Sequence, residues 1–114
     1  MRTLAEVELT EKDRRAVVAA STILRRRFDV AEVVLFGSKA RGDDRPDSDI
    51  DLLVLTHGPV SDEVKRGMTD ALFDLEIEMG VVFSKLVVPI DDWKHGLYRV
   101  LPIRRAVDQD GVAA

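Results

Sequence analysis

Apolar residues recur every three or four positions in two long segments of the chain, which predicts two amphipathic helices. The first helix should begin after an N-cap at Thr10, and the second should run from an N-cap at Ser61 to a stop at Gly80. The apolar stripes comprise Val17, Ala20, Leu24 and Phe28 in the first helix and Val64, Met68, Leu72, Leu75 and Met79 in the second. Each apolar stripe should be buried against other elements in a hydrophobic core.

Three short apolar runs, rich in β-branched residues, predict the strands of that core. The predicted strands are residues 31–36, 49–55 and 81–88. The second run is apolar without alternation, which indicates a strand buried on both faces. After the third run, Asp91 or Asp92 is the expected cap of a last helical stretch, which Pro102 should bend or split.

The order of these elements predicts an α/β (α+β) fold, in which helices pack on a small mixed sheet of three to four strands. A chain of 114 residues is expected to form a single domain over residues 1–114. The closing residues, "GVAA", fit either a frayed tail or a short edge strand.

Composition and charge limit the kinds of partner that the protein is expected to bind and the compartment in which it is expected to occur. The net charge is −4, so the chain lacks the basic excess of a surface that binds duplex nucleic acid. It has no cysteine, which excludes disulfides and thiolate metal sites and agrees with a cytoplasmic protein. No apolar run reaches the ~18 residues of a membrane helix, and the N-terminus lacks the apolar core of a signal sequence.

The most informative stretch is "LFGSKARGDDRPDSDIDLLVL", residues 35–55, which joins the first two predicted strands. Residues two apart in a strand point to the same face, ~6.5–7 Å apart, so Asp49 and Asp51 should project side by side. Two unpaired carboxylates repel each other and resist burial, and a divalent cation removes that cost. Their hard oxygen ligands suit Mg²⁺, the metal ion of phosphoryl transfer.

The residues before the aspartates fit a phosphate ligand. Gly37 allows the backbone to come close to a phosphate, and Ser38 offers a hydroxyl and a backbone N–H at the expected start of a short helical turn. Lys39, Arg41 and Arg45 are nearby cations that could meet the rest of a triphosphate. The stretch therefore predicts a site for a nucleoside triphosphate and its metal.

Two other ligand-binding motifs do not fit. Gly37 and Gly42 have the spacing of a P-loop, but Asp43 stands where that loop requires lysine. The alternating aspartates match the start of an EF-hand, but Leu52 and Gly58 occupy its turn and bidentate positions. A Gly-Ser turn or an Asp-Ser-Asp cap alone is common in plain turns. Both together, in order between two strands, favour a catalytic loop.

The stretch "GSKARGDDRPDSDIDLLV" resembles the signature of the DNA polymerase β-type nucleotidyltransferases. The Ala-Arg-Gly sequence that follows Gly-Ser is similar to the sequence at this place in the compact members of the family, the minimal nucleotidyltransferases. "DDW" after the third predicted strand and "IRRAVDQDG" near the end also resemble that family. The resemblance implies a polymerase β palm-like fold. It also implies transfer of a nucleoside monophosphate, AMP above all, from a nucleoside triphosphate to a hydroxyl, with Mg²⁺ and release of pyrophosphate.

The resemblance also assigns roles to residues. Gly37 and Ser38 would hold the triphosphate, and Asp49 and Asp51 would be the catalytic metal ligands. Arg41 would either contact the nucleotide or brace the loop by pairing with Asp47 or Asp49.

The sequence departs from the family pattern at one metal ligand. Members of the family usually carry a third carboxylate on the next strand, and that position falls at Ser84, with Lys85 beside it. The run 80–90 contains no acid. The nearest acids in the sequence are Glu76, Glu78, Asp91 and Asp92. Serine is a poor base, and a lysine facing the site would repel a second cation.

The chain has little length beyond the expected catalytic core, so a second molecule should complete the cleft. In the minimal family that partner is an all-helical HEPN-type protein, and the pair resembles a toxin–antitoxin system in which the nucleotidyltransferase is the antitoxin. A homo-oligomer is a second option. Three functions follow: an active Mg²⁺-dependent nucleotidyltransferase, a degenerate module that neutralises or scaffolds its partner without chemistry, and a regulatory nucleotide-binding domain.

Overall fold

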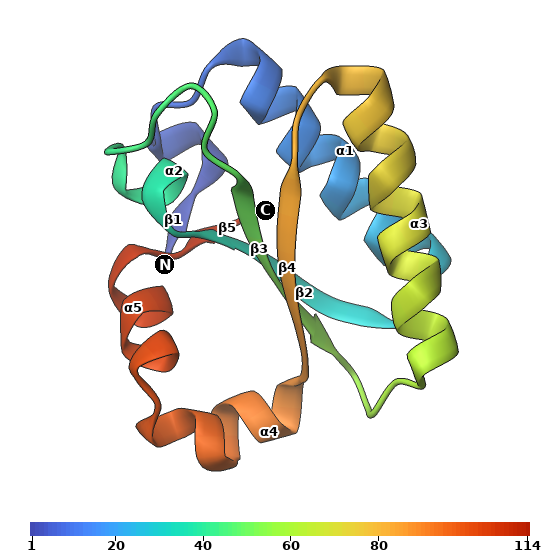
Figure 1. Cartoon of the computed structure of the whole chain (residues 1–114). Helices are drawn as coiled ribbons and strands as arrows, with labels where there is room; N and C mark the ends of the chain where they lie inside the picture. The colour runs from blue at the N-terminus through green and yellow to red at the C-terminus, as the bar shows by residue number, and fades with distance from the viewer.

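The predicted helices and strands are present in the computed structural model, which describes residues 1–114 (Figure 1). The elements in chain order are β1 (Arg2–Thr3), η1 (Leu4–Glu6), α1 (Glu11–Arg27), β2 (Val30–Phe36), α2 (Ser38–Arg41), β3 (Ile50–Thr56), α3 (Asp62–Met79), β4 (Phe83–Pro89), α4 (Ile90–His95), η2 (Leu97–Val100), α5 (Pro102–Asp110) and β5 (Val112–Ala113). None of these helices combines the length with the apolar character that a membrane-spanning helix requires.

The sheet has five strands in the order β1-β5-β2-β3-β4, so the prediction of three to four strands was wrong. The additional strands, β1 and β5, have two residues each, too few to produce an alternating pattern in the sequence. β5 pairs with β1 on one side and with β2 on the other, so the closing residues form neither a frayed tail nor an edge. β3 pairs antiparallel with β2 and parallel with β4, which makes the sheet mixed.

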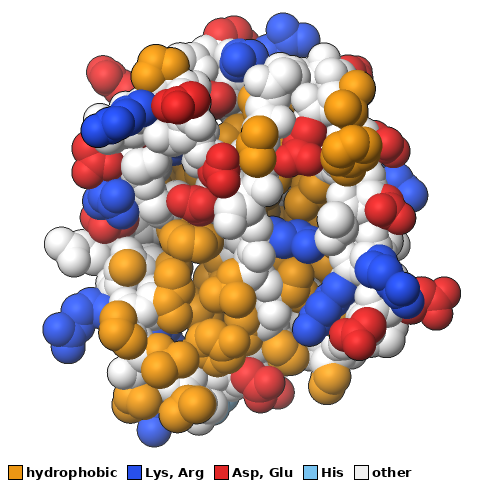
Figure 2. All heavy atoms as spheres, in the orientation of Figure 1, with side chains coloured by type: hydrophobic (Ala, Val, Ile, Leu, Met, Phe, Trp, Pro, Cys, Tyr) orange, Lys and Arg blue, Asp and Glu red, His pale blue; other side chains and the backbone are white.

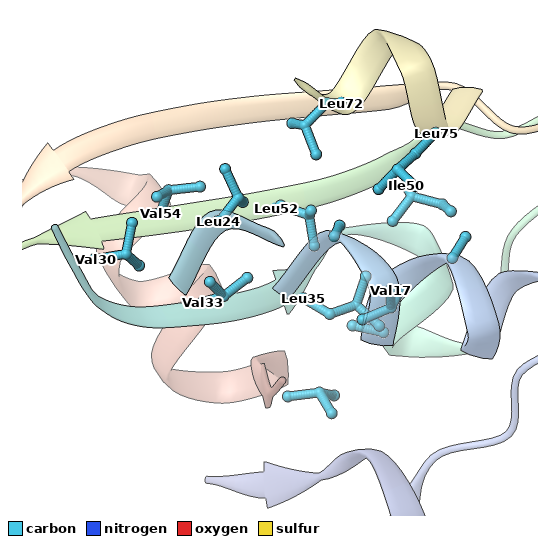
Figure 3. Packing of buried hydrophobic residues seen from close by; sticks show 14 of the residues in the cluster. Val17, Leu24, Val30, Val33, Leu35, Ile50, Leu52, Val54, Leu72 and Leu75 are labelled. Atoms are coloured by element: carbon cyan, nitrogen blue, oxygen red, sulfur yellow. The ribbon is translucent and has the colours of Figure 1, made fainter. Parts of the chain in front are cut away.

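One face of the sheet is covered by α1 and α3, as the sequence pattern predicts (Figure 1). Both N-caps are confirmed: Thr10 Oγ1 accepts a hydrogen bond from Asp13 N, and Ser61 Oγ accepts one from Val64 N. Gly80 ends α3 with a positive φ of 69°. The close-up in Figure 3 shows the core between these helices and strands β2 and β3. Its labelled side chains are Val17, Leu24, Val30, Val33, Leu35, Ile50, Leu52, Val54, Leu72 and Leu75.

The opposite face is covered by the C-terminal segments α4 and α5, where Trp93 and Val107 pack on the sheet. α4 begins at Ile90 directly after Pro89, so Asp91 and Asp92 lie in its first turn and the prediction of an aspartate cap was wrong. Proline fixes its own φ and starts the helix without a side-chain cap. Figure 2 views this side and shows hydrophobic side chains gathered low, beside α4 and α5, with charged groups above them.

Strand β3 lies inside the sheet and is buried on both faces, as its continuous apolar run predicts. Leu52 and Val54 belong to the core under α1 and α3, while Leu53 and Leu55 belong to the core under α4 and α5. Because side chains alternate along a strand, Asp51 points to the same face as Leu53. The first residues of β3 therefore carry a carboxylate onto the face covered by α4 and α5, at its polar end.

Candidate functional site

Asp49 and Asp51 lie at the start of β3, next to both neighbouring strands. Asp51 is half-buried and stands in register with Phe36 on β2 and Ser84 on β4. Asp49 precedes the strand and is exposed. Burial of the carboxyl raises the pKa of Asp51, the charge of Asp49 raises it further, and Arg41 lowers it. The two carboxylates are therefore close enough to repel each other, as the sequence predicts.

Gly37 brings the backbone of the preceding loop directly against Asp51. A Cβ atom at residue 37 would lie 2.1 Å from Asp51 Oδ2, closer than any real carbon–oxygen contact. The Gly37 backbone also has φ 77° and ψ −158°, a region that is essentially restricted to glycine. The Gly-Ser turn and the aspartates, which lie 11 to 14 residues apart in sequence, thus form one site.

Ser38 begins the short helix α2, at the place where the sequence predicts a helical turn. Arg41 N donates to Gly37 O at 3.0 Å, and Gly42 N donates to Ser38 O at 2.9 Å. The first backbone N–H groups of a helix have no partner inside it and are available to an anion. The Ser38 side chain is half-buried and remains free to add a hydroxyl.

The three cations predicted for the triphosphate have different surroundings. Lys39 is only 3% exposed and its ammonium is paired with Asp13 and Asp44, so it is directed away from a phosphate in the site. Arg41 is exposed and pairs with Asp43 at 3.1 Å rather than with the predicted Asp47 or Asp49. The hydrogen bond to Asp43 raises the pKa of Arg41 above its ordinary value.

Arg45 is exposed, and its backbone N–H donates to Ser48 Oγ within the turn that precedes the aspartates. Its guanidinium is therefore at the surface of the loop. Arg41 and Arg45 are the two cations of this stretch that a nucleotide could reach without breaking a buried ion pair.

Ser84, where the sequence resemblance would place a third carboxylate, faces Asp51 in the parallel β3–β4 register. Lys85 donates to Thr69 Oγ1 on α3 at 2.6 Å, so it lies on the opposite face and does not repel a cation at the site. Glu76 accepts the backbone N–H of Phe83. Asp91 and Asp92 follow β4 at its other end. No group of three or more acidic, histidine or cysteine side chains could hold a metal ion.

The pair of aspartates nevertheless fits Mg²⁺. Its oxygens are the hard ligands that this ion prefers, and binding would offset both the burial and the repulsion by Asp49 that raise the pKa of Asp51. Mg²⁺ usually keeps several waters and is held by one or two carboxylates together with substrate phosphates. Asp49 and Asp51 would be its protein ligands here, with the phosphates of a nucleotide lying towards Gly37 and Ser38.

We expect Asp51→Asn to stabilise the metal-free protein at neutral pH. Because the folded-state pKa of Asp51 is raised, the unfolded chain loses this proton first as the pH increases, so ionisation of Asp51 costs stability. The cost is absent below the unfolded pKa of about 3.9 and complete above the folded pKa. Solvent screening of this half-buried group should keep the gain below about 1 kcal/mol. Urea denaturation in EDTA at acidic and neutral pH measures it.

Asp47→Asn is the matched control for this experiment, because it removes the same charge from an exposed position in the same loop. Its effect on the free energy of unfolding should be small at both pH values. A wild-type protein that is as stable as Asp51→Asn at neutral pH would contradict the expected cost of burying this carboxylate.

Sequence patterns did not reveal the residues that support the loop from behind. Asp13 has the ordinary position of an acid in the first turn of a helix, yet it is 7% exposed and paired with Lys39. Arg2 donates to the backbone carbonyls of Ala40 and Asp110 at 2.8 and 2.7 Å. Both contacts are long-range, and no local spacing indicates them.

Comparison with known proteins agrees with this geometry. The family model "Nucleotidyltransferase domain" matches residues 18–104, which include the Gly-Ser turn, both aspartates and the parallel strand β4. No curated protein matches the chain. A solved structure, described as a crystal structure of a toxin–antitoxin with AMP-PNP, has a similar fold. It has a TM-score of 0.58 at 16% identity, over 90% of this chain and 71% of that one. The chain belongs to the nucleotidyltransferase domain family.

Proposed function

We propose that this protein transfers AMP from ATP to a hydroxyl group of an all-helical HEPN-type partner, with Mg²⁺, and acts as the antitoxin of that partner. The observation that carries the proposal is the contact between the Gly37 backbone and the Asp51 carboxylate. It joins a phosphate-binding turn to a pair of metal-binding acids, which is the arrangement that phosphoryl transfer requires.

Each residue of the site has a definite part in the reaction. Ser38 and the first N–H groups of α2 would hold the β- and γ-phosphates, while Asp49 and Asp51 would hold Mg²⁺, which would supply positive charge to neutralise the phosphates. The acceptor oxygen bonds to the α-phosphorus, the bond from that phosphorus to the bridging oxygen breaks, and pyrophosphate leaves. Ser84 is a poor base, so the hydroxyl proton passes to water or to the carboxylate pair.

Two observations support a nucleotide and a protein partner. The solved structure with a similar fold is a toxin–antitoxin holding AMP-PNP, an ATP analogue. In this chain, Leu97 and Val100 on η2 are 73% and 74% exposed, which is costly for large apolar side chains in water. Exposed apolar groups of this kind are typical of surfaces that contact another protein.

A second candidate function is a module that binds and neutralises the partner without chemistry. Ser84 favours it, because this residue faces Asp51 where an acid would complete the metal site. In that case the site would keep its shape but would not turn over. The two functions differ in whether AMP is transferred, and therefore in whether the carboxylates are needed for protection of cells from the partner.

The transferase is tested by incubating the protein with ATP labelled at the α-phosphate, Mg²⁺ and a co-expressed HEPN-type protein. We expect label on the partner, and we expect either EDTA or Asp49→Asn to lower it at least about 100-fold. Asp49 is exposed, so its replacement should leave the fold intact. Asp47→Asn, the neighbouring exposed aspartate, should transfer label at the wild-type rate.

Absence of labelling with all four nucleoside triphosphates and with either Mg²⁺ or Mn²⁺ would reject the transferase. The binding module would then be tested in cells. It requires that Asp49→Asn and Asp51→Asn still protect against the partner, and it fails if both variants bind the partner but no longer protect.

A further inference from the structure

Lys39 is the buried cation of the molecule, and two carboxylates share it. Its Nζ lies 2.8 Å from Asp13 Oδ2 and 3.1 Å from Asp44 Oδ2, with 3% of the lysine side chain exposed. Burial alone would lower the pKa of Lys39, but the hydrogen bonds to Asp13 and Asp44 and the charges of these carboxylates together raise it above its ordinary value. The ammonium is therefore charged at neutral pH.

The three charged residues belong to three different segments. Lys39 is the second residue of α2, Asp13 lies in the first turn of α1, and Asp44 lies in the loop between α2 and β3. α1 is anchored by its buried stripe in the main core. Through Lys39, both the short helix and the following loop are attached to that rigid helix.

This attachment acts on both halves of the candidate site. Lys39 follows Ser38 directly, and Asp44 precedes Asp49 by five residues. α2 has only four residues, so in isolation it would not hold its shape. Arg2 secures the far end of α2 by donating to the carbonyl of Ala40. A buried ion pair adds little net stability compared with apolar side chains of equal size, so a stability role alone does not account for it.

The geometry points to Lys39 as a positioning residue, which fixes α2 and the loop 42–48 on α1 so that Ser38 and Asp49 can engage the same triphosphate. It replaces the direct phosphate contact that the sequence suggests for Lys39. The inference rests on the proposed nucleotidyl transfer, because it assigns Lys39 a task in holding the nucleotide site.

Lys39→Met tests this role, because methionine fills a similar volume without the charge. We expect the dissociation constant for ATP with Mg²⁺, measured by calorimetry, to rise about tenfold. In the nucleotide-free protein, the amide hydrogens of Arg41, Gly42 and Asp43 should exchange about tenfold faster. These amides donate to the carbonyls of Gly37 and Ser38 and so report on the shape of α2.

Three further variants separate positioning from general stability. Lys39→Arg keeps the charge and should keep the ATP dissociation constant close to that of wild type. Asp44→Asn weakens the ion pair between Lys39 and Asp44 and should raise the ATP dissociation constant about threefold. Because Asp44 is an exposed loop residue, the core should be unaffected. Lys65→Met removes an exposed lysine on α3 and should change neither ATP binding nor amide exchange in α2.

The outcomes distinguish this inference from the proposed function. If wild-type protein binds ATP and Lys39→Met binds it equally well with unchanged exchange, Lys39 is not a positioning residue and the transferase proposal stands. If wild-type protein binds no nucleoside triphosphate with Mg²⁺ or Mn²⁺, both proposals fail. If Lys39→Met does not fold, unchanged ATP binding in Asp44→Asn overturns the inference.

Discussion

Gly37→Ala should destabilise the protein by about 2–4 kcal/mol and remove nucleotide binding. Two costs add at this position. The φ and ψ angles of residue 37 fall in a region that residues with a side chain rarely adopt. The new methyl group would also overlap Asp51 Oδ2, so either the loop or the carboxylate must move. Either movement separates the phosphate-binding turn from the metal ligand. Urea denaturation and calorimetry with ATP and Mg²⁺ measure the two effects.

Gly42→Ala is the matched control for this variant. Gly42 also has a positive φ, 83°, but a Cβ atom there would have no neighbour within 4 Å. It should cost only about 1 kcal/mol for the left-handed backbone and leave ATP binding within about threefold of wild type. Equal losses of stability and binding in the two variants would show that the contact with Asp51 carries no special weight.

The fold was largely predictable because its main elements obey local rules. The caps at Thr10 and Ser61, the stop at Gly80 and the buried middle strand all follow from residue type and spacing over a few positions, and the structure confirms each of them. The pairing of β1 and β5 was not predictable, because two-residue strands gain their hydrogen bonds from partners far along the chain. Their pairing depends on the whole sheet rather than on their own sequence.

The candidate site was likewise predictable from the sequence only in part. The meeting of Gly37 with Asp51 could be expected from a loop that joins adjacent strands, and the structure shows it. Lys39 could not be assigned correctly, because a lysine beside a phosphate loop and a lysine paired behind it have the same sequence context. Only the tertiary contact with Asp13, 26 residues earlier, distinguishes the two. Charged residues near a site therefore need a structure before they are given a ligand.

Ser84→Asp should increase the affinity of the protein for Mg²⁺ about tenfold or more. Residue 84 is exposed and faces Asp51 across the parallel strands, so the new carboxylate would join Asp49 and Asp51 on one face. Without metal, the added negative charge should cost up to about 1 kcal/mol of stability through repulsion of Asp51. With Mg²⁺ the same charge becomes a ligand, and it also supplies the base that serine does not.

Ser84→Asn separates the effect of charge from that of size, because asparagine has nearly the same shape as aspartate but cannot ionise. It should leave Mg²⁺ affinity close to that of wild type, while Ser84→Asp binds Mg²⁺ more tightly and transfers label faster in the presence of ATP. A gain in metal affinity without any transfer would favour the module that binds without chemistry. If calorimetry gave the wild-type affinity for Mg²⁺ in both variants, residues 51 and 84 would not bind the same ion. Residue 84 would then not be the position of a third metal ligand, although the register of β3 and β4 brings it next to Asp51.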